Sequence, residues 1–353
     1  RAQEIERGAV IGPRLITTGP ILNSQGPNAQ INHQIVATAN DARAAVQQQH
    51  RAGFRRLKVY SNLTREAYQA ILREAGRLGM TVMGHTPEGV RKPGMPGRVP
   101  FEIAFEEILD DGFVTIEHVE SIVWHALGNR HDAAAGRALA RRIAAADVPV
   151  DATLLAFNNL LKVAETKGEY LKRPGTELLN PLLVAQSQAE YERWAGEDVD
   201  RNRAAFEFYK HMARMLSEEG VLIVAGSDAG IFTNVPGVSL IEELELLAEA
   251  GLEPASVLRA ATINAAIALG EQDHAGRVAE GYRADLVLVD GDPTKDLAVL
   301  KSVSGVVAGD RYFDRPALDR QLVRAAQHDV LRTQRNLVEA LSAQGIDPNT
   351  LGL

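Results

Sequence analysis

Short apolar segments rich in β-branched residues alternate with amphipathic segments along most of the chain. This alternation is typical of parallel βα units, in which a helix follows each strand and covers the sheet. Six segments are predicted to be strands: Pro13–Thr18, Arg56–Tyr60, Thr81–Gly84, Val114–Glu117, Val148–Thr153 and Val221–Gly226. The pattern therefore predicts an α/β fold built on a parallel sheet.

Helical spacing of apolar positions occupies several segments between these strands. Residues 65–79 begin after Thr64, a suitable N-cap, and end at Gly79, a residue typical of helix ends. The same spacing predicts helices over residues 133–146 and 242–250. The long polar stretch 170–215 separates the last two predicted strands, so we expect a lid or a crossover insertion there.

The pattern changes around Gly276. Residues 276–289 and 302–313 contain short strand-like segments separated by Gly and Asp-Pro turn signals, with no helix between them. These features predict a small β appendage. Residues 318–343 return to helical spacing and are expected to form a packing helix.

The composition excludes several classes of protein. Of the 353 residues 45% are hydrophobic and 24% charged, which is ordinary for a globular chain and excludes disorder. The net charge of −8 argues against nonspecific binding to nucleic acid or to anionic membranes. Cysteine is absent, so disulfides, thiolate metal sites and cysteine nucleophiles are excluded. No apolar run is long enough to cross a bilayer.

The chain opens at Arg1 without an initiator Met and without a recognisable targeting segment. We therefore expect a mature or truncated start. The sequence does not decide between a cytoplasmic and an exported protein, because an export signal would lie upstream of Arg1.

Four polar side chains occupy predicted strands or the positions just after them. His85 and His118 directly follow two strands, Asp228 follows a third after one intervening residue, and Lys58 lies inside a fourth. In a β/α barrel the carboxyl ends of the strands converge on one mouth, where sites are built. Each residue alone has a structural explanation, as a hydrogen-bonded histidine, a helix cap or an edge-strand lysine. Together they indicate a site.

The residue types suit a divalent metal. Imidazole nitrogen and carboxylate oxygen are ligands that zinc accepts. The ammonium of Lys58 cannot bind a metal, but a carbamate formed with carbon dioxide offers two oxygens and could bridge two ions. A buried setting favours this chemistry, because desolvation lowers a lysine pKa towards the reactive neutral amine.

The motifs GPRLITTG, RLKVYSNLT, TVMGHTPEG, TIEHVES and VAGSDAG occur in this order, followed by VLRAATINAAIALG and GRVAEGYRADLVLVDGDP. With them the chain resembles the metal-dependent amidohydrolase superfamily, specifically the imidazolonepropionase-like branch that includes several Xaa-Pro dipeptidases. The resemblance covers about residues 12–313.

The resemblance implies a (β/α)8 TIM-type barrel with a small β-sandwich. The family carries a His-x-His pair on strand 1, and this sequence has none. Because only six strands are predicted, we expect strands 3–8 of a barrel truncated at its N-terminus. The expected domains are an incomplete barrel over residues 1–270, part of the sandwich over 271–316 and a helical tail over 317–353.

The resemblance also implies roles for named residues. Lys58 would be the carboxylated lysine that bridges two zinc ions, and His85 and His118 would be metal ligands. Asp228 would bind metal and shuttle the proton in catalysis. Tyr60 and His33 would contact substrate. Two carboxylates are candidates to orient the histidines: Glu117 and Glu120.

The implied activity is hydrolysis of an amide bond in a dipeptide or an N-acyl amino acid by a metal-bound hydroxide. A lactam, cyclic-amide or ester hydrolase, or a deaminase, is an alternative within the superfamily. A truncated barrel with only a binding role, or with no function, is another. The expected partners are a small-molecule substrate and a second copy of the chain, but neither nucleic acid nor a membrane.

The remaining polar positions receive weaker predictions. His125 and His131 are expected on the surface, and His33 in a loop rich in Gly, Asn and Pro. Asn62 begins a glycosylation sequon, and residues 94–100 are expected to form a loop. Three arginines are candidates to bind a substrate carboxylate, although each reads more readily as a solvated helix charge: Arg173, Arg193 and Arg203.

Overall fold

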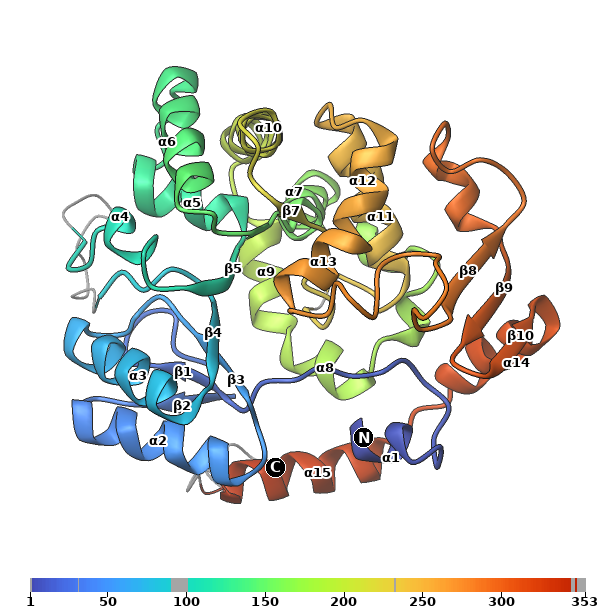
Figure 1. Ribbon diagram of the computed structural model, residues 1–353, viewed down its shortest axis with the longest axis horizontal. Coiled ribbons are helices and arrows are strands. Elements are labelled where there is room, and N and C mark those ends of the chain that lie inside the picture. The colour runs from blue at the N-terminus through green and yellow to red at the C-terminus, as the bar shows by residue number, and fades with distance from the viewer. Residues whose placement is uncertain (1, 31, 90–100, 232, 344–346, 348–353) are drawn as a thin grey trace. The chain divides into compact units, whose positions relative to one another are not determined.

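The computed structural model describes residues 2–30, 32–89, 101–231, 233–343 and 347 (Figure 1). The predicted loop at 94–100 lies outside the described residues. The chain divides into two compact units. The first unit comprises residues 1–117 and 124–128, and the second unit comprises residues 118–123 and 129–353. This division into two units differs from the three domains expected from the sequence, and those three domains stay a prediction.

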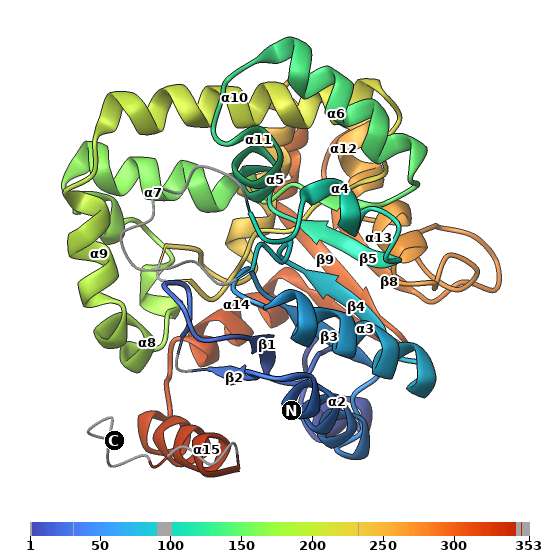
Figure 2. The same ribbon diagram turned by 90° about the vertical axis from the view of Figure 1, so that its left-hand side faces the viewer.

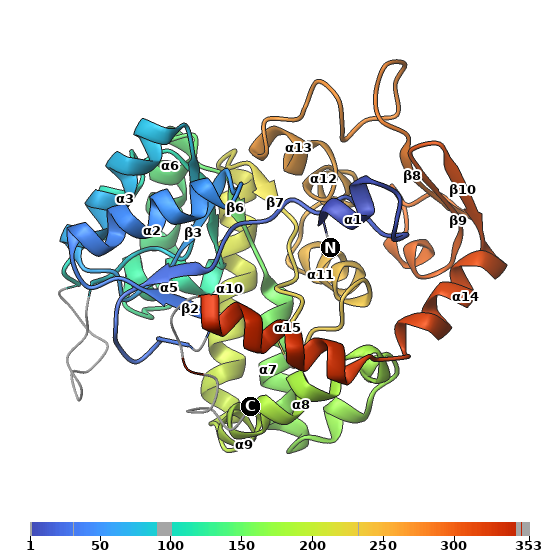
Figure 3. The ribbon, with the colours of Figure 1, turned by 90° about the horizontal axis from the view of Figure 1, so that it is seen from below.

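The first unit is built on a parallel sheet, as predicted. Its strands lie in the order β2, β1, β3, β4, β5. Their bounds are β1 Ile21–Asn23, β2 His33–Ile35, β3 Arg56–Val59, β4 Thr81–Gly84 and β5 Phe113–Glu117. The helices of this unit are α1 Ala2–Glu6, α2 Ala39–Arg51, α3 Arg65–Leu78 and α4 Phe105–Ile108. Helices α2 and α3 pack side by side (Figure 3).

Helix α3 begins and ends where the sequence predicts. The Thr64 hydroxyl accepts a hydrogen bond from the backbone N–H of Ala67 at 3.1 Å, which satisfies one of the unpaired donors of the first turn. Gly79 ends the helix in the left-handed conformation at φ 65°, where a side chain would be strained. Ile71 and Ala75 are buried on the apolar face.

The predicted strand Pro13–Thr18 is wrong. These residues are irregular, and the first strand is β1, which begins one residue after Pro20. Pro13 has no N–H to donate to a sheet. Strand β2 was not predicted, because its three residues are too few to show a period of two. His33 therefore lies at the start of a strand and not in a loop.

The second unit contains the parallel pair β6 (Val150–Asp151) and β7 (Ile223–Val224), both shorter than predicted. Helix α5 (Val119–Leu127) has residues in both units. The other helices before β8 are α6 Ala133–Ala145, α7 Leu154–Thr166, η1 Glu169–Lys172, η2 Thr176–Leu178, α8 Pro181–Gln186, α9 Gln188–Ala195, α10 Val199–Glu218, α11 Val238–Glu249, α12 Pro254–Ala260 and α13 Ile263–Ala268.

The predicted lid or crossover at 170–215 is mostly helical. Its longest helix, α10, packs against α6 and α7 and ends just before β7 (Figure 2). That placement is the one expected of a crossover helix.

The expected β appendage is an antiparallel sheet in the order β10, β9, β8. Its strands are β8 Asp285–Val289, β9 Val303–Ala308 and β10 Arg311–Asp314, with η3 at Leu297–Lys301. The tail forms two helices and not one: α14 (Arg315–Ala325) packs on β9 and β10, and α15 (Val330–Ala343) follows (Figure 3). No helix within the described ranges is both long and apolar enough to span a bilayer.

Candidate active site

Three rings of the first unit stand in a row. The Tyr60 ring centroid lies 4.7 Å from that of His33 and 4.0 Å from that of His85. Tyr60 follows β3, and His85 follows β4 with its backbone N–H donating to the carbonyl of Val59 at 3.2 Å. The structure therefore brings together three of the residues that the sequence singled out.

Lys58 on β3 forms an ion pair with Glu117 at the end of β5, with Nζ 2.6 Å from Oε2. The two side chains are 23% and 12% exposed. Strand β4 lies between them, and its Gly84 pairs with Val59 on one side and Ile116 on the other. A Cβ on Gly84 would meet the Val59 carbonyl at 2.4 Å and Lys58 Cγ at 3.2 Å. Glycine at position 84 thus makes room for this ion pair.

His33 is buried and electrically neutral. Its Nδ1 accepts hydrogen bonds from Asn23 Nδ2 at 3.1 Å and from the backbone N–H of Gln30 at 3.3 Å. A backbone N–H can only donate, so the ring proton lies on Nε2. Burial, with the positive charge of Lys58, lowers the pKa of His33 from 6.5 to about 4. Nε2 is buried and has no hydrogen-bond partner among the described residues.

The second unit carries three residues other than glycine in the left-handed conformation just after successive strands. His118 has φ 70° after β5, Thr153 has φ 45° after β6 and Asp228 has φ 47° after β7. Such backbone costs about 1–3 kcal/mol per residue and is found most often at functional sites. The conformation marks two of the four predicted ligands.

His118 is fixed by β6 and the residues after it. Its backbone N–H donates to the Asp151 carbonyl at 2.9 Å, and its Nδ1 is hydrogen-bonded to the Thr153 hydroxyl. The Phe157 ring stands edge-on to the imidazole, with centroids 6.4 Å apart. Because the hydrogen bond to Thr153 uses Nδ1, a metal-ligand role falls to Nε2.

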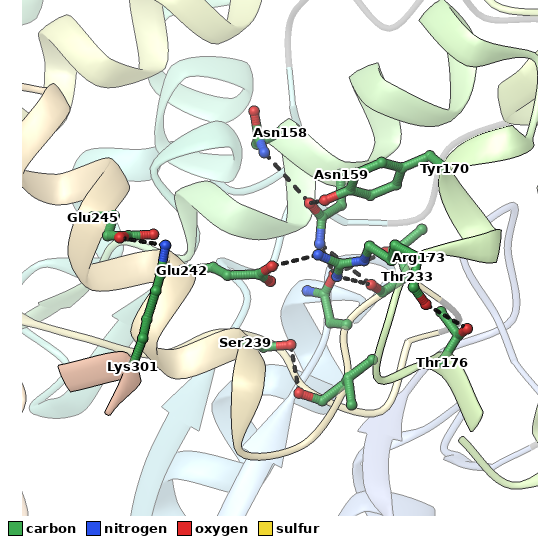
Figure 4. Close-up of polar contacts among 12 residues, drawn as sticks. Asn158, Asn159, Tyr170, Arg173, Thr176, Thr233, Ser239, Glu242, Glu245 and Lys301 are labelled. Carbon is green, nitrogen blue, oxygen red and sulfur yellow. Dashed lines mark hydrogen bonds and ion pairs between the residues drawn. The ribbon is translucent and has the colours of Figure 1, made fainter. Parts of the chain in front are cut away.

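The loop that carries Asp228 is held by a series of buried amides, and Figure 4 shows its first contact, between Tyr170 and Asn159. Tyr170 Oη donates to Asn159 Oδ1 at 2.7 Å, and Asn159 Nδ2 donates to Asn234 Oδ1 at 2.8 Å. Asn234 Nδ2 then donates to the carbonyl of Ser227, the residue before Asp228, at 2.6 Å. This series of hydrogen bonds was not predicted from the sequence, because no local pattern distinguishes Asn159 from other helix residues.

Arg173 belongs to the same cluster and is not a solvated charge. Its guanidinium pairs with Glu242, donates to the Thr233 carbonyl at 2.9 Å and lies 4.6 Å from the centre of the Tyr170 ring (Figure 4). These contacts give Arg173 a structural role and occupy the guanidinium that was a candidate to bind a substrate carboxylate. Arg193 lies over the Trp194 ring, and Arg203 is a half-exposed helix charge paired with Glu165 and Asp200.

The surface prediction for His125 is wrong. This side chain is buried, its Nδ1 is bonded to Thr86 Oγ1 at 2.9 Å, and its Nε2 donates to the Ile103 carbonyl at 2.8 Å. His131 is exposed, as expected, and stacks on Phe208. Asn62, the sequon residue, is fully buried.

The predicted ligands divide equally between the units: Lys58 and His85 belong to the first, His118 and Asp228 to the second. Among the described residues, no group of three or more His, Asp or Glu side chains lies close enough to hold an ion. The donor chemistry, imidazole nitrogen with carboxylate oxygen, is nevertheless the chemistry that zinc accepts.

Comparison with known proteins shows similarity to amidohydrolases. The model of the amidohydrolase family matches residues 137–311. The chain is 36% identical over 91 residues to an imidazolonepropionase from Rubrobacter xylanophilus, which is 24% of this chain and 21% of that protein. It is 33% identical over 104 residues to an ochratoxinase from Aspergillus niger, which is 28% of this chain and 21% of that protein. The matches thus span about a fifth of these curated relatives.

Solved structures extend the likeness over nearly the whole chain. A bottromycin amidohydrolase has a TM-score of 0.67 and 26% identity, covering 99% of this chain and 72% of that one. A Xaa-Pro dipeptidase with bound methionine in its active site has a TM-score of 0.64 and 19% identity, covering 89% and 71%, which shows the fold alone. The chain thus matches the amidohydrolase family over residues 137–311 and shares the fold of a solved amidohydrolase over nearly its whole length. The similarity to imidazolonepropionases is the one that the sequence motifs indicated, and the Xaa-Pro dipeptidase and a prolidase-like protein share the fold.

Proposed function

We propose that this chain is a metal-dependent hydrolase that cleaves amide bonds. The observation that carries the proposal is the strained backbone at His118 and Asp228, each beyond the end of a parallel strand. Buried neighbours hold His118 and the residue before Asp228, and the amidohydrolase family model matches residues 137–311. Strain of this kind persists only where the surrounding structure enforces it.

Four side chains would hold the metal: Lys58, His85, His118 and Asp228. Two zinc ions bridged by carboxylated Lys58 are the arrangement we propose. When bound, a divalent metal supplies Lewis acidity, which activates water and polarises a carbonyl. The remaining chemistry falls to the chain itself.

Asp228 is the proposed proton carrier, because a carboxylate that receives a proton from the attacking water can deliver it to the departing nitrogen. His33 is suited to bind substrate, since its Nε2–H is a buried donor that stays neutral at physiological pH. A carbonyl or carboxylate oxygen is the natural acceptor for that donor. Tyr60, whose ring contacts those of both His33 and His85, is the proposed second substrate contact.

The substrate class we propose is a dipeptide or an N-acyl amino acid. The names of two similar structures support a dipeptide, since one is a Xaa-Pro dipeptidase and another a prolidase complexed with n-methylphosphonate-l-proline. We further propose that the parallel strands correspond to strands 3–8 of a barrel. Strands β8–β10 would form part of a sandwich. The chain covers 72% of the bottromycin amidohydrolase chain.

A hydrolysis screen tests the activity. The purified chain, supplied with zinc and bicarbonate, would be offered Xaa-Pro dipeptides, N-acyl amino acids, lactams and simple esters. We expect amide cleavage that is lost in Asp228→Asn and retained in Asp132→Asn, a carboxylate change at a helix cap. Cleavage of esters or lactams alone would shift the substrate class, and cleavage that is equal in both variants would contradict the role of Asp228.

A further inference from the structure

Helix α7 begins in an unusual way. Its N-cap residue is Thr153, a residue type whose hydroxyl ordinarily accepts a hydrogen bond from the first turn of the helix. Thr153 instead adopts the left-handed conformation, at φ 45° and ψ 43°, and its side chain makes no cap hydrogen bond. The first N–H groups of α7 therefore need an acceptor from elsewhere.

Glu243 of helix α11 supplies that acceptor. Its Oε1 accepts from the Leu154 N–H at 3.0 Å and its Oε2 accepts from the Leu155 N–H at 2.6 Å. The side chain is fully buried, and burial raises its pKa well above the ordinary value, with the charge of Asp151 acting in the same direction. Burying a carboxyl group is costly, whereas a threonine cap is not. Glu243 thus performs at a cost what Thr153 could do locally.

The hydroxyl of Thr153 has a different partner. Its Oγ1 is hydrogen-bonded to Nδ1 of His118, which is also fully enclosed. When Nδ1–H donates to this hydroxyl, Nε2 keeps the lone pair that a ligand or a base requires. We propose that Glu243 is a positioning residue for His118: by capping α7 in place of Thr153, it assigns the threonine hydroxyl to the imidazole. The value of this arrangement to catalysis rests on the proposed function, but the arrangement itself does not.

The test uses the full chain without added metal, so that its result is independent of zinc binding and activity. The variants are Glu243→Ala, Glu243→Gln and a matched control, Asp132→Ala. Asp132 caps α6 in the same manner, accepting from the N–H groups of Ala134 and Ala135 at 3.0 and 3.1 Å. Amide hydrogen exchange reports the two helix starts, and nitrogen-15 spectra of labelled histidine report the tautomer of His118.

In Glu243→Ala we expect exchange at Leu154 and Leu155 to accelerate roughly tenfold, the amount that loss of a cap corresponds to. We also expect the His118 ring to change from one tautomer to a mixture. Asp132→Ala should accelerate exchange at Ala134 and Ala135 and leave His118 unchanged. If Glu243→Ala does not fold, Glu243→Gln gives the same comparison with a smaller effect, because its amide keeps one acceptor oxygen.

A single unchanged His118 tautomer beside accelerated exchange at Leu154 and Leu155 would overturn the proposal, since Glu243 would then be a cap and nothing more. Unchanged exchange in a folded variant would overturn it as well. If His118 responds as expected but the protein binds no zinc and cleaves no amide, the positioning role stands and the proposed function fails.

Discussion

Lys58 Nζ lies 2.6 Å from Glu117 Oε2, across the width of strand β4. In this ion pair the lysine is an ammonium. A carbamate on Lys58 would instead be an anion facing the carboxylate of Glu117, and like charges at this separation repel strongly where water is partly excluded. The ion pair and the proposed carboxylated state are therefore alternatives, and we expect Glu117 to influence which of them Lys58 adopts.

Glu117→Gln should favour carboxylation of Lys58. The substitution removes the partner of the ammonium and the repulsion on the carbamate. We expect a stronger carbamate signal in carbon-13 spectra after incubation with labelled bicarbonate, and none in Lys58→Ala. Equal signals from Glu117→Gln and the unaltered protein would show that Glu117 has no such control.

Gly84→Ala should destabilise the first unit more than Gly79→Ala does. Both glycines have positive φ, 127° and 65°, so both substitutions carry backbone strain of about 1 kcal/mol. Only at Gly84 does the new Cβ collide, with the Val59 carbonyl at 2.4 Å, whereas nothing lies within 4 Å at Gly79. Urea denaturation should show a loss of about 1 kcal/mol at Gly79 and at least about 1 kcal/mol more at Gly84. Equal losses would mean that the approach of β4 to β3 is less close than described.

His33 should titrate near pH 4. Its folded pKa of about 4 lies below the ordinary 6.5, so the folded protein binds fewer protons than the unfolded chain between these values. The stability contributed by the neutral ring is therefore complete above pH 6.5 and is lost as the pH falls towards 4. Ring-proton shifts measured against pH give the pKa directly, and denaturation of His33→Gln should depend less on pH in this interval. A midpoint near 6.5 would show that His33 is solvated.

Asn159→Ala should affect catalysis and stability more than Asn158→Ala. Asn159 is fully buried and links Tyr170 to Asn234, whereas the Asn158 amide makes one long bond of 3.4 Å, to Asn159 (Figure 4). Removing Asn159 leaves buried partners unsatisfied, which costs about 1–3 kcal/mol. Because this series of amides ends at Ser227, we also expect kcat to fall with KM little changed. Similar kcat values for the two variants would contradict the expectation that Asn159 affects catalysis through the loop that carries Asp228.

Elements whose ends are set by residues close in sequence, such as helix caps, could be predicted from the sequence. Strand β4 has the bounds that the sequence predicts, and α3 begins after Thr64 and ends at Gly79 because cap chemistry is encoded within a few residues. The segment Pro13–Thr18 was mistaken for a strand because its β-branched residues suggested one, while the proline and the lack of a pairing partner excluded it. Pairing partners are not visible in a local window.

The candidate site was predictable only in part. His85, His118 and Asp228 could be found because they follow strands, and position after a strand is a feature of the sequence. The supporting residues could not be found, because Glu243 is 89 residues from Leu154 and Asn234 is 75 residues from Asn159. His125 was misplaced for the same reason, since its partners Thr86 and Ile103 are distant in sequence. Only folding brings such groups together.

We propose that this chain binds catalytic metal through Lys58, His85, His118 and Asp228. Metal content per chain, measured by plasma mass spectrometry after purification with zinc and bicarbonate, tests it most directly. We predict close to two zinc ions, a clear loss in Lys58→Ala and His118→Ala, and no loss in His131→Ala, an exposed histidine outside the site. A folded protein that binds no zinc, or zinc content equal in all three variants, would contradict the account.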